Sequence, residues 1–100
     1  MIQGLTKVNG GNLGGTSLQG YLPDMNTDSF TKLCEDYGSY VYEDSTESYK
    51  GYDREAEFTI DGIFFTVYNR DGKYRFGTKP ENQEKVGQAL KSIGITVEYL

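Results

Sequence analysis

The chain has 100 residues, a formal net charge of −5 and no histidine. This length suits one domain with one modest hydrophobic core. The negative charge argues against direct nucleic-acid binding, which needs Lys and Arg to neutralise phosphates. The absence of histidine removes the commonest catalytic base and metal ligand. With Cys34 as its single cysteine, the chain has no internal disulfide. No signal peptide or transmembrane run is visible, so we expect a soluble cytoplasmic protein that does not bind membranes.

We expect a single domain over residues 1–100, with a glycine-rich N-terminal arm at residues 1–15. The arm holds five of the 13 glycines. A glycine-rich loop can cradle a phosphate, but a P-loop needs a Lys and a helix directly after it, and neither follows here. Two interpretations stay open: a flexible or edge-lying arm, and a clamp for an anionic ligand. The apolar residues of the arm indicate contact with an apolar surface; they are Ile2, Leu5, Val8 and Leu13.

A strand is predicted over residues 17–22, because Pro23 ends the segment and cannot extend a ladder. Helix-start residues follow, namely Asp24, Asn26, Thr27 and Asp28. Apolar residues then recur at i, i+3, i+4 and i+7, which predicts an amphipathic helix; they are Phe30, Leu33, Cys34 and Tyr37. Gly38 is expected to cap this helix in the left-handed conformation. Its place on the apolar face makes Cys34 a buried structural thiol rather than a nucleophile.

Residues 39–54 are predicted to be irregular. Four tyrosines lie among four carboxylates in this segment. Tyrosine is enriched at recognition surfaces, because it offers a large contact area and a polar tip. Two interpretations remain: a solvated acidic loop whose tyrosines pack on the rim of the sheet, and a recognition loop.

The segment from Glu55 to Phe76 predicts a three-stranded meander, because its β-branched and aromatic residues alternate around Asp61-Gly62 and Asp71-Gly72. Turns at these pairs set the register and place one group of side chains on the core face: Ala56, Phe58, Ile60, Ile63, Phe65 and Val67, continued by Asn69, Tyr74 and Phe76. The opposite face then carries Glu55, Glu57, Thr59, Phe64, Thr66 and Tyr68.

The last third of the chain predicts a helix and a strand. Thr78-Lys79-Pro80-Glu81 has the form of a capping box. Val86, Ala89, Leu90 and Ile93 mark one helical face that Gly94 ends, and residues 95–100 alternate as in a strand. The element order predicts an α+β fold, a small two-layer domain of the split βαβ kind, βαββ(β)αβ. Its antiparallel sheet has both helices on one face and leaves the other face open.

Catalysis finds little support in the sequence. Glu55 and Glu57 would lie about 7 Å apart on one strand face, but nothing indicates a pocket that would raise the pKa of either carboxyl group. Without histidine, only an all-carboxylate site could hold a hard cation, and the spacing of an EF-hand is absent. We therefore expect a protein that is not an enzyme and has no cofactor or metal.

Two stretches carry a resemblance. One is Gly15-Thr16-Ser17-Leu18-Gln19-Gly20-Tyr21, and the other runs from Tyr49 through Glu57-Phe58 and Asp61-Gly62 to Thr66-Val67-Tyr68-Asn69. Together they resemble a family of short tailed-phage proteins without an assigned activity. The family has a Gly-Thr-Ser-x-Gln-Gly-Tyr opening, a later Lys-x-x-x-Glu-Trp strand, an Asp-Gly turn and a Thr-x-Tyr strand. The match covers about half of the chain, and Phe58 stands where the family usually has tryptophan.

The resemblance implies a phage origin and a cytoplasmic location in an infected bacterium. By analogy, we expect an acidic binding protein that counteracts host defence, by sequestering a nucleotide signal or by blocking a defence protein. The expected contacts are Ser17, Gln19, Tyr21, Arg54, Tyr68 and Arg75. Two alternatives remain: a DNA mimic that inhibits a nucleic-acid-binding host protein, and a minor virion or assembly component. We also expect a homo-oligomer, formed through the open sheet face or an edge strand.

Overall fold

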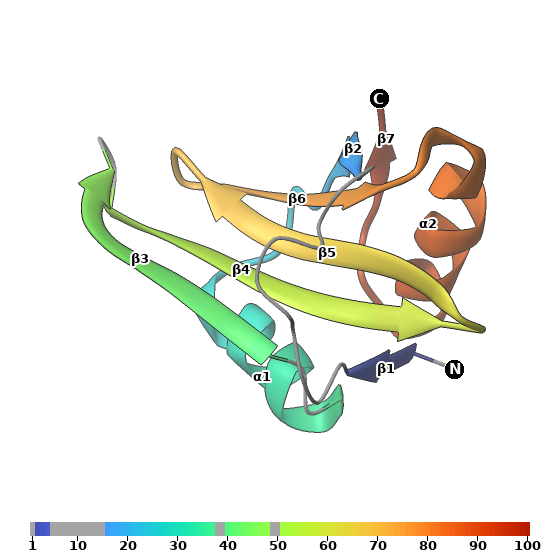
Figure 1. Ribbon diagram of the computed structural model, residues 1–100, viewed down its shortest axis with the longest axis horizontal. Coiled ribbons are helices and arrows are strands. Elements are labelled where there is room, and N and C mark those ends of the chain that lie inside the picture. The colour runs from blue at the N-terminus through green and yellow to red at the C-terminus, as the bar shows by residue number, and fades with distance from the viewer. Residues whose placement is uncertain (1, 5–15, 38–39, 49–50) are drawn as a thin grey trace.

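The computed structural model describes residues 2–4, 16–37, 40–48 and 51–100, with the backbone alone for residues 3, 4, 40–48 and 51–53. A seven-stranded antiparallel sheet and two helices make up this part of the chain (Figure 1). The predicted α+β class is therefore confirmed. Across the sheet the strands are β1 (Ile2–Gly4), β4 (Gly51–Ile60), β5 (Ile63–Arg70), β6 (Lys73–Thr78), β2 (Ser17–Tyr21) and β7 (Glu98–Tyr99), and β3 (Tyr40–Ser48) also pairs with β4.

The meander of β4, β5 and β6 has the predicted register. The opposed pairs include Ile60 with Ile63, Phe58 with Phe65, Ala56 with Val67, Val67 with Phe76, and Asn69 with Tyr74. Both Asp-Gly pairs turn with positive φ, 48° and 78° at Asp61-Gly62 and 54° and 78° at Asp71-Gly72. These angles are those of type I′ turns, whose twist matches the flanking strands. Local residues are therefore sufficient to set this register.

The free edge of β4 carries two strands that the sequence did not predict. β1 pairs with the end of β4 at Ile60, and β3 pairs with its earlier part, where Tyr40 lies opposite Glu57. The prediction that residues 39–54 are irregular is wrong for β3 and for the start of β4. The segment extends because the unpaired N–H and C=O groups along β4 offer it a hydrogen-bonding partner. Ile2 is buried in the core, as its apolar character indicated. Of the predicted arm, residues 2–4 form β1, and residues 1 and 5–15 lie outside the described residues.

The predicted C-terminal strand is shorter than expected. Residues 95–100 were expected to be extended, but β7 contains Glu98 and Tyr99 only, which pair with Tyr21 and Gly20. The reason lies at the end of the preceding helix, where the Ile95 N–H donates to the Leu90 carbonyl at 3.1 Å. That bond completes the helix end, so the strand begins later.

Two helices cover one face of the sheet. α1 (Thr27–Tyr37) begins as predicted, and Asn26 Oδ1 accepts a hydrogen bond from the Ser29 N–H at 2.9 Å. α2 (Gln83–Ser92) follows a short 3-10 turn, η1 (Pro80–Asn82). The predicted capping box is wrong, because Thr78 is the last residue of β6 and its Oγ1 donates to the Phe64 carbonyl at 2.9 Å. The predicted cap at Gly38 lies outside the described residues.

The core lies between this face of the sheet and the two helices. The Phe30 ring of α1 lies 5.3 Å from the Tyr74 ring of β6, centroid to centroid. At the other end, Gly87 of α2 sits directly against the ring of Tyr99. Cys34 is partly buried and packs against the core, so it lies on the apolar face as predicted. Buried core residues come from both helices, from β1, β4, β5 and β6, and from the residue directly after β2: Ile2, Leu22, Phe30, Leu33, Ala56, Phe58, Ile60, Phe65, Val67, Tyr74, Phe76, Val86, Ala89 and Leu90.

The opposite face was expected to be open, and its centre is not. Glu57 is only 4% exposed and Thr66 only 2% exposed. These two residues lie opposite each other on β4 and β5. Because β3 pairs with the outer side of β4, Glu57 belongs to an interior strand rather than to an edge strand. The exposed part of this face therefore lies nearer to β6, β2 and β7.

Candidate functional site

A row of polar and aromatic side chains crosses this second face of the sheet. Glu55 lies opposite Tyr68, Tyr68 opposite Arg75, Arg75 opposite Tyr21, and Tyr21 opposite Glu98. Directly opposed residues in antiparallel strands place their side chains on the same face. The cross-strand row (Glu55, Tyr68, Arg75, Tyr21 and Glu98) therefore runs from β4 to β7.

Two guanidinium groups lie over the two tyrosine rings of the row. Arg75 Cζ is 5.5 Å from the centroid of the Tyr21 ring, and Arg70 Cζ is 5.6 Å from that of the Tyr68 ring. Both distances are within the range of cation–π attraction. Arg75 Nη2 also donates to the Arg70 carbonyl at 3.4 Å. Arg75 Nε is buried and finds no hydrogen-bond acceptor among the described residues, so one donor of this cation is unused.

The β4 end of the row is acidic. Burial raises the pKa of Glu55 above its usual 4.5, and the charge of Arg70 partly opposes this effect. Burial also raises the pKa of Glu57, and the negative charge of Glu55 adds to the increase. Both effects favour the protonated, neutral carboxyl groups. Burial raises the pKa of Tyr68 too, so its hydroxyl group stays protonated and can donate a hydrogen bond.

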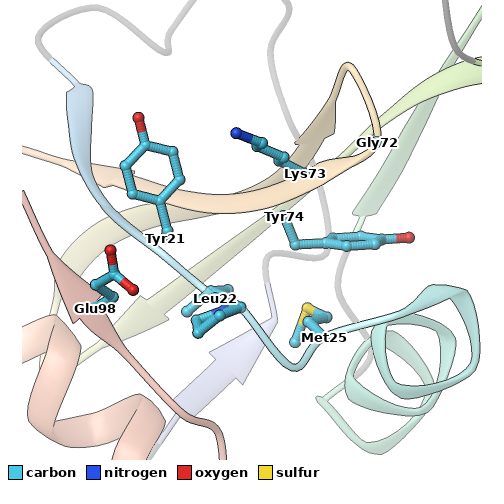
Figure 2. Close-up of a pocket in the computed structure, with 8 residues that line it drawn as sticks. Tyr21, Leu22, Met25, Gly72, Lys73, Tyr74 and Glu98 are labelled. Atoms are coloured by element: carbon cyan, nitrogen blue, oxygen red, sulfur yellow. The ribbon is translucent and has the colours of Figure 1, made fainter.

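A cavity of about 500 Å³ opens at the other end of the row, where β2, β6 and β7 meet (Figure 2). This volume lies within the range of small-molecule sites. Apolar side chains form one wall, and the polar groups come from three different strands. The lining residues are Tyr21, Leu22, Pro23, Met25, Gly72, Lys73, Tyr74 and Glu98.

Opposite charges face this cavity from β6 and β7, the two strands that flank β2. Figure 2 shows Tyr21 and Lys73 extending to the same side, with the Glu98 carboxylate beside Tyr21 and Leu22 and Met25 below them. Lys73 and Arg75 are two residues apart on β6, so both side chains point to the face that carries the row. The cavity thus combines a cation, an aromatic ring, a carboxylate and an apolar wall. This combination can hold a planar, polar molecule with an anionic group.

The structure brings together three of the six residues predicted to form the site. Tyr21, Tyr68 and Arg75 are consecutive in the row. Arg54 does not join them, because its side chain lies on the helix side of the sheet with Cζ 6.0 Å from the centroid of the Phe30 ring.

Ser17 and Gln19 lie further along β2, and both are engaged within the protein. Gln19 Nε2 donates to Ser17 Oγ at 2.8 Å. The main-chain carbonyl of Gln19 accepts hydrogen bonds from Gln83 Nε2 at 2.9 Å and from the Leu100 N–H at 3.1 Å. These contacts attach the start of α2 and the residue after β7 to β2, which is a structural role.

Sequence reasoning missed Lys73, Glu98 and the apolar wall. The alternation of Lys73 and Arg75 on a predicted strand was a usable signal, because residues two apart share a face. Glu98 had no local signal. Its position beside Tyr21 depends on pairing between strands that are distant in the sequence.

In the part of the chain that the structure describes, no three His, Cys, Asp or Glu side chains cluster so as to hold a metal ion. Neither of the described helices is long and apolar enough to cross a membrane. No protein-family model, curated protein or solved structure matches the chain. The arrangement of the site is therefore the basis for any functional proposal.

Proposed function

We propose that the protein is a non-enzymatic phage protein that counteracts a host defence system by sequestering a nucleotide signal. The observation that carries the proposal is the cavity at the end of the cross-strand row, where Lys73, Tyr21 and Glu98 meet. The resemblance to short tailed-phage proteins supports the biological setting. A binding role fits a site that presents contacts for a ligand and no evident nucleophile.

Each part of the site matches one part of a nucleotide. Stacking of a base on an aromatic side chain contributes about 1–3 kcal/mol and tolerates any base. Tyr21 offers such a ring at the cavity. Lys73, which also lines the cavity, can supply charge-assisted hydrogen bonds to a phosphate. Pro23 and Met25 offer apolar surface to one side of the ligand.

The first test is depletion of nucleotides by the purified protein. The protein is incubated with a panel of linear and cyclic nucleotides, the free fraction is separated by filtration, and the bound fraction is released by denaturation and identified by chromatography. A sequestering protein depletes one class of nucleotide and returns it intact. Release of a chemically altered nucleotide would show that the protein is an enzyme. If no nucleotide of the panel is depleted, sequestration is contradicted and an inhibitor that binds a defence protein is favoured.

Variants at the cavity sharpen the test. Tyr21→Ala should weaken nucleotide binding by about tenfold or more, because the stacking surface is lost, whereas Tyr21→Phe should retain most of the affinity. Lys73→Met should weaken binding, and the matched control Lys32→Met should not, since Lys32 is exposed on α1 and pairs with Asp36 at 3.0 Å. Circular dichroism checks that each variant is folded. Equal binding by folded Tyr21→Ala and by the wild type would place the site elsewhere.

A further inference from the structure

We infer that the cavity selects guanine among the bases, with Glu98 binding the base edge and Lys73 binding the phosphate. This inference rests on the proposed function and adds the class of ligand. Its basis is the order of three side chains that line the cavity: the cation of Lys73 on β6, the ring of Tyr21 on β2 and the carboxylate of Glu98 on β7.

The spacing of these three groups follows from the sheet. β2 lies between β6 and β7, so the strand of Tyr21 separates the Lys73 cation from the Glu98 carboxylate. Two strand spacings amount to about 10 Å. That span is comparable to the distance from the outer edge of a purine to the phosphate of its mononucleotide. A nucleotide lying across β2 would therefore reach both ends while its base or sugar contacts the Tyr21 ring.

The cation end is suited to a phosphate because Lys73 lines the cavity and is exposed. Its ammonium group can therefore donate charge-assisted hydrogen bonds to phosphate oxygens. Arg75 lies two residues further along the same face of β6 and adds positive charge to this end, while its guanidinium group stays over the Tyr21 ring, with Cζ 5.5 Å from the centroid.

The carboxylate end discriminates between bases. Guanine presents two adjacent donors on one edge, the ring N1–H and the exocyclic amino group, and a carboxylate accepts both bonds in parallel. Adenine and cytosine each place an acceptor nitrogen beside the amino group, which repels a carboxylate oxygen. Uracil has a single N–H between two carbonyl oxygens, which also repel the carboxylate. Glu98 therefore favours guanine over the other three bases.

The test is calorimetric titration of the intact protein with GMP, AMP, CMP and UMP. GMP should bind about tenfold to a hundredfold more tightly than the other three, which is the usual discrimination from a bidentate base contact. Glu98→Gln should remove most of this preference, because GMP loses the carboxylate contact while AMP, no longer repelled by a carboxylate oxygen, binds at least as tightly as before. Lys73→Met should weaken all four nucleotides by a similar factor. Guanosine, which lacks the phosphate, should lose affinity for the wild-type protein.

A matched control is Glu84→Gln, which neutralises an exposed carboxylate on α2 and should leave the preference for GMP intact. Equal affinities for the four nucleotides, or a preference for GMP that survives in Glu98→Gln, would overturn the inference and leave nucleotide sequestration standing. Absence of binding by all four, together with a negative depletion panel, would overturn both proposals.

Discussion

At the scale of single residues, Glu57 shows how a buried carboxylate affects stability. Its side chain is 4% exposed, and no hydrogen bond reaches Oε2 from the residues that the structure describes. Its pKa is raised above 4.5, mainly by burial and further by Glu55. The folded state therefore binds the proton more tightly than the unfolded chain does. The stabilisation from this group is complete below the unfolded pKa of about 4.5 and is lost as the pH rises through the raised folded pKa.

Glu57→Gln should remove this pH dependence. Near pH 7 the neutral amide avoids the cost of burying a charge, so the free energy of unfolding should rise by about 1 kcal/mol or more. At pH 4 the variant and the wild type should differ little. Urea unfolding at both pH values measures the effect. The exposed Glu84→Gln is the control, and a loss of stability at pH 7 in Glu57→Gln would contradict the expected sign.

From the sequence, neighbours in the cross-strand row can be predicted only where a tight turn joins the two strands and sets their register. Tyr68 and Arg75 belong to neighbouring meander strands, so the Asp71-Gly72 turn alone places them side by side. Tyr21 was predicted as a contact residue because it ends the Gly-Thr-Ser-x-Gln-Gly-Tyr motif, and not because its place beside Arg75 could be derived. Glu98 and the separation of Arg54 from the row could not be predicted, because both depend on which strands meet across the sheet and which face the helices cover.

At the scale of elements, Gly20 is the point where β2, β6 and β7 come close together. A Cβ atom added there would meet the ring of Phe76 and, at 2.7 Å, the carbonyl oxygen of Glu98. The Phe76 ring is fully buried, and the second contact is to backbone. Neither can move away without a change in packing, so glycine is required at this position.

Gly20→Ala should destabilise the protein by about 1–3 kcal/mol, the usual cost of overpacking a core. It should also displace β7 and thereby weaken nucleotide binding at Glu98. Thermal unfolding followed by circular dichroism measures the first effect, and calorimetry measures the second. Gln88→Ala, on the exposed side of α2, is the control. A melting temperature unchanged in Gly20→Ala would show that β7 is not held as described.

Other elements show why part of the fold escaped prediction. The segment of β3 is polar and acidic, so it lacks the alternation that identifies a strand, and it becomes extended by pairing with a distant edge. Thr78 has the sequence of a helix cap, yet its hydroxyl group is taken by the Phe64 carbonyl of the neighbouring strand. In both cases a contact between distant segments replaced the local preference.

At the scale of the whole molecule, the strands differ in how firmly they are held. β5 lies between β4 and β6 and pairs with both along most of its length. β7 pairs with β2 through two residues only. The amide groups of β5 should therefore exchange with solvent most slowly, because they open only on global unfolding, and those of β7 should exchange among the fastest. Hydrogen exchange followed by NMR measures this gradient, and equal rates in β5 and β7 would contradict it.

Because β7 pairs with β2 through two residues only, binding of a nucleotide depends on the fraction of molecules in which β7 is docked on β2. Glu98 is in place only in molecules whose β7 is docked, so the apparent affinity for a guanine nucleotide is the intrinsic affinity reduced by the docked fraction. Conversely, a nucleotide that bridges β6, β2 and β7 would raise this fraction and stabilise the folded state by mass action. The shortest strand of the described sheet would then be the one that gains most from the ligand.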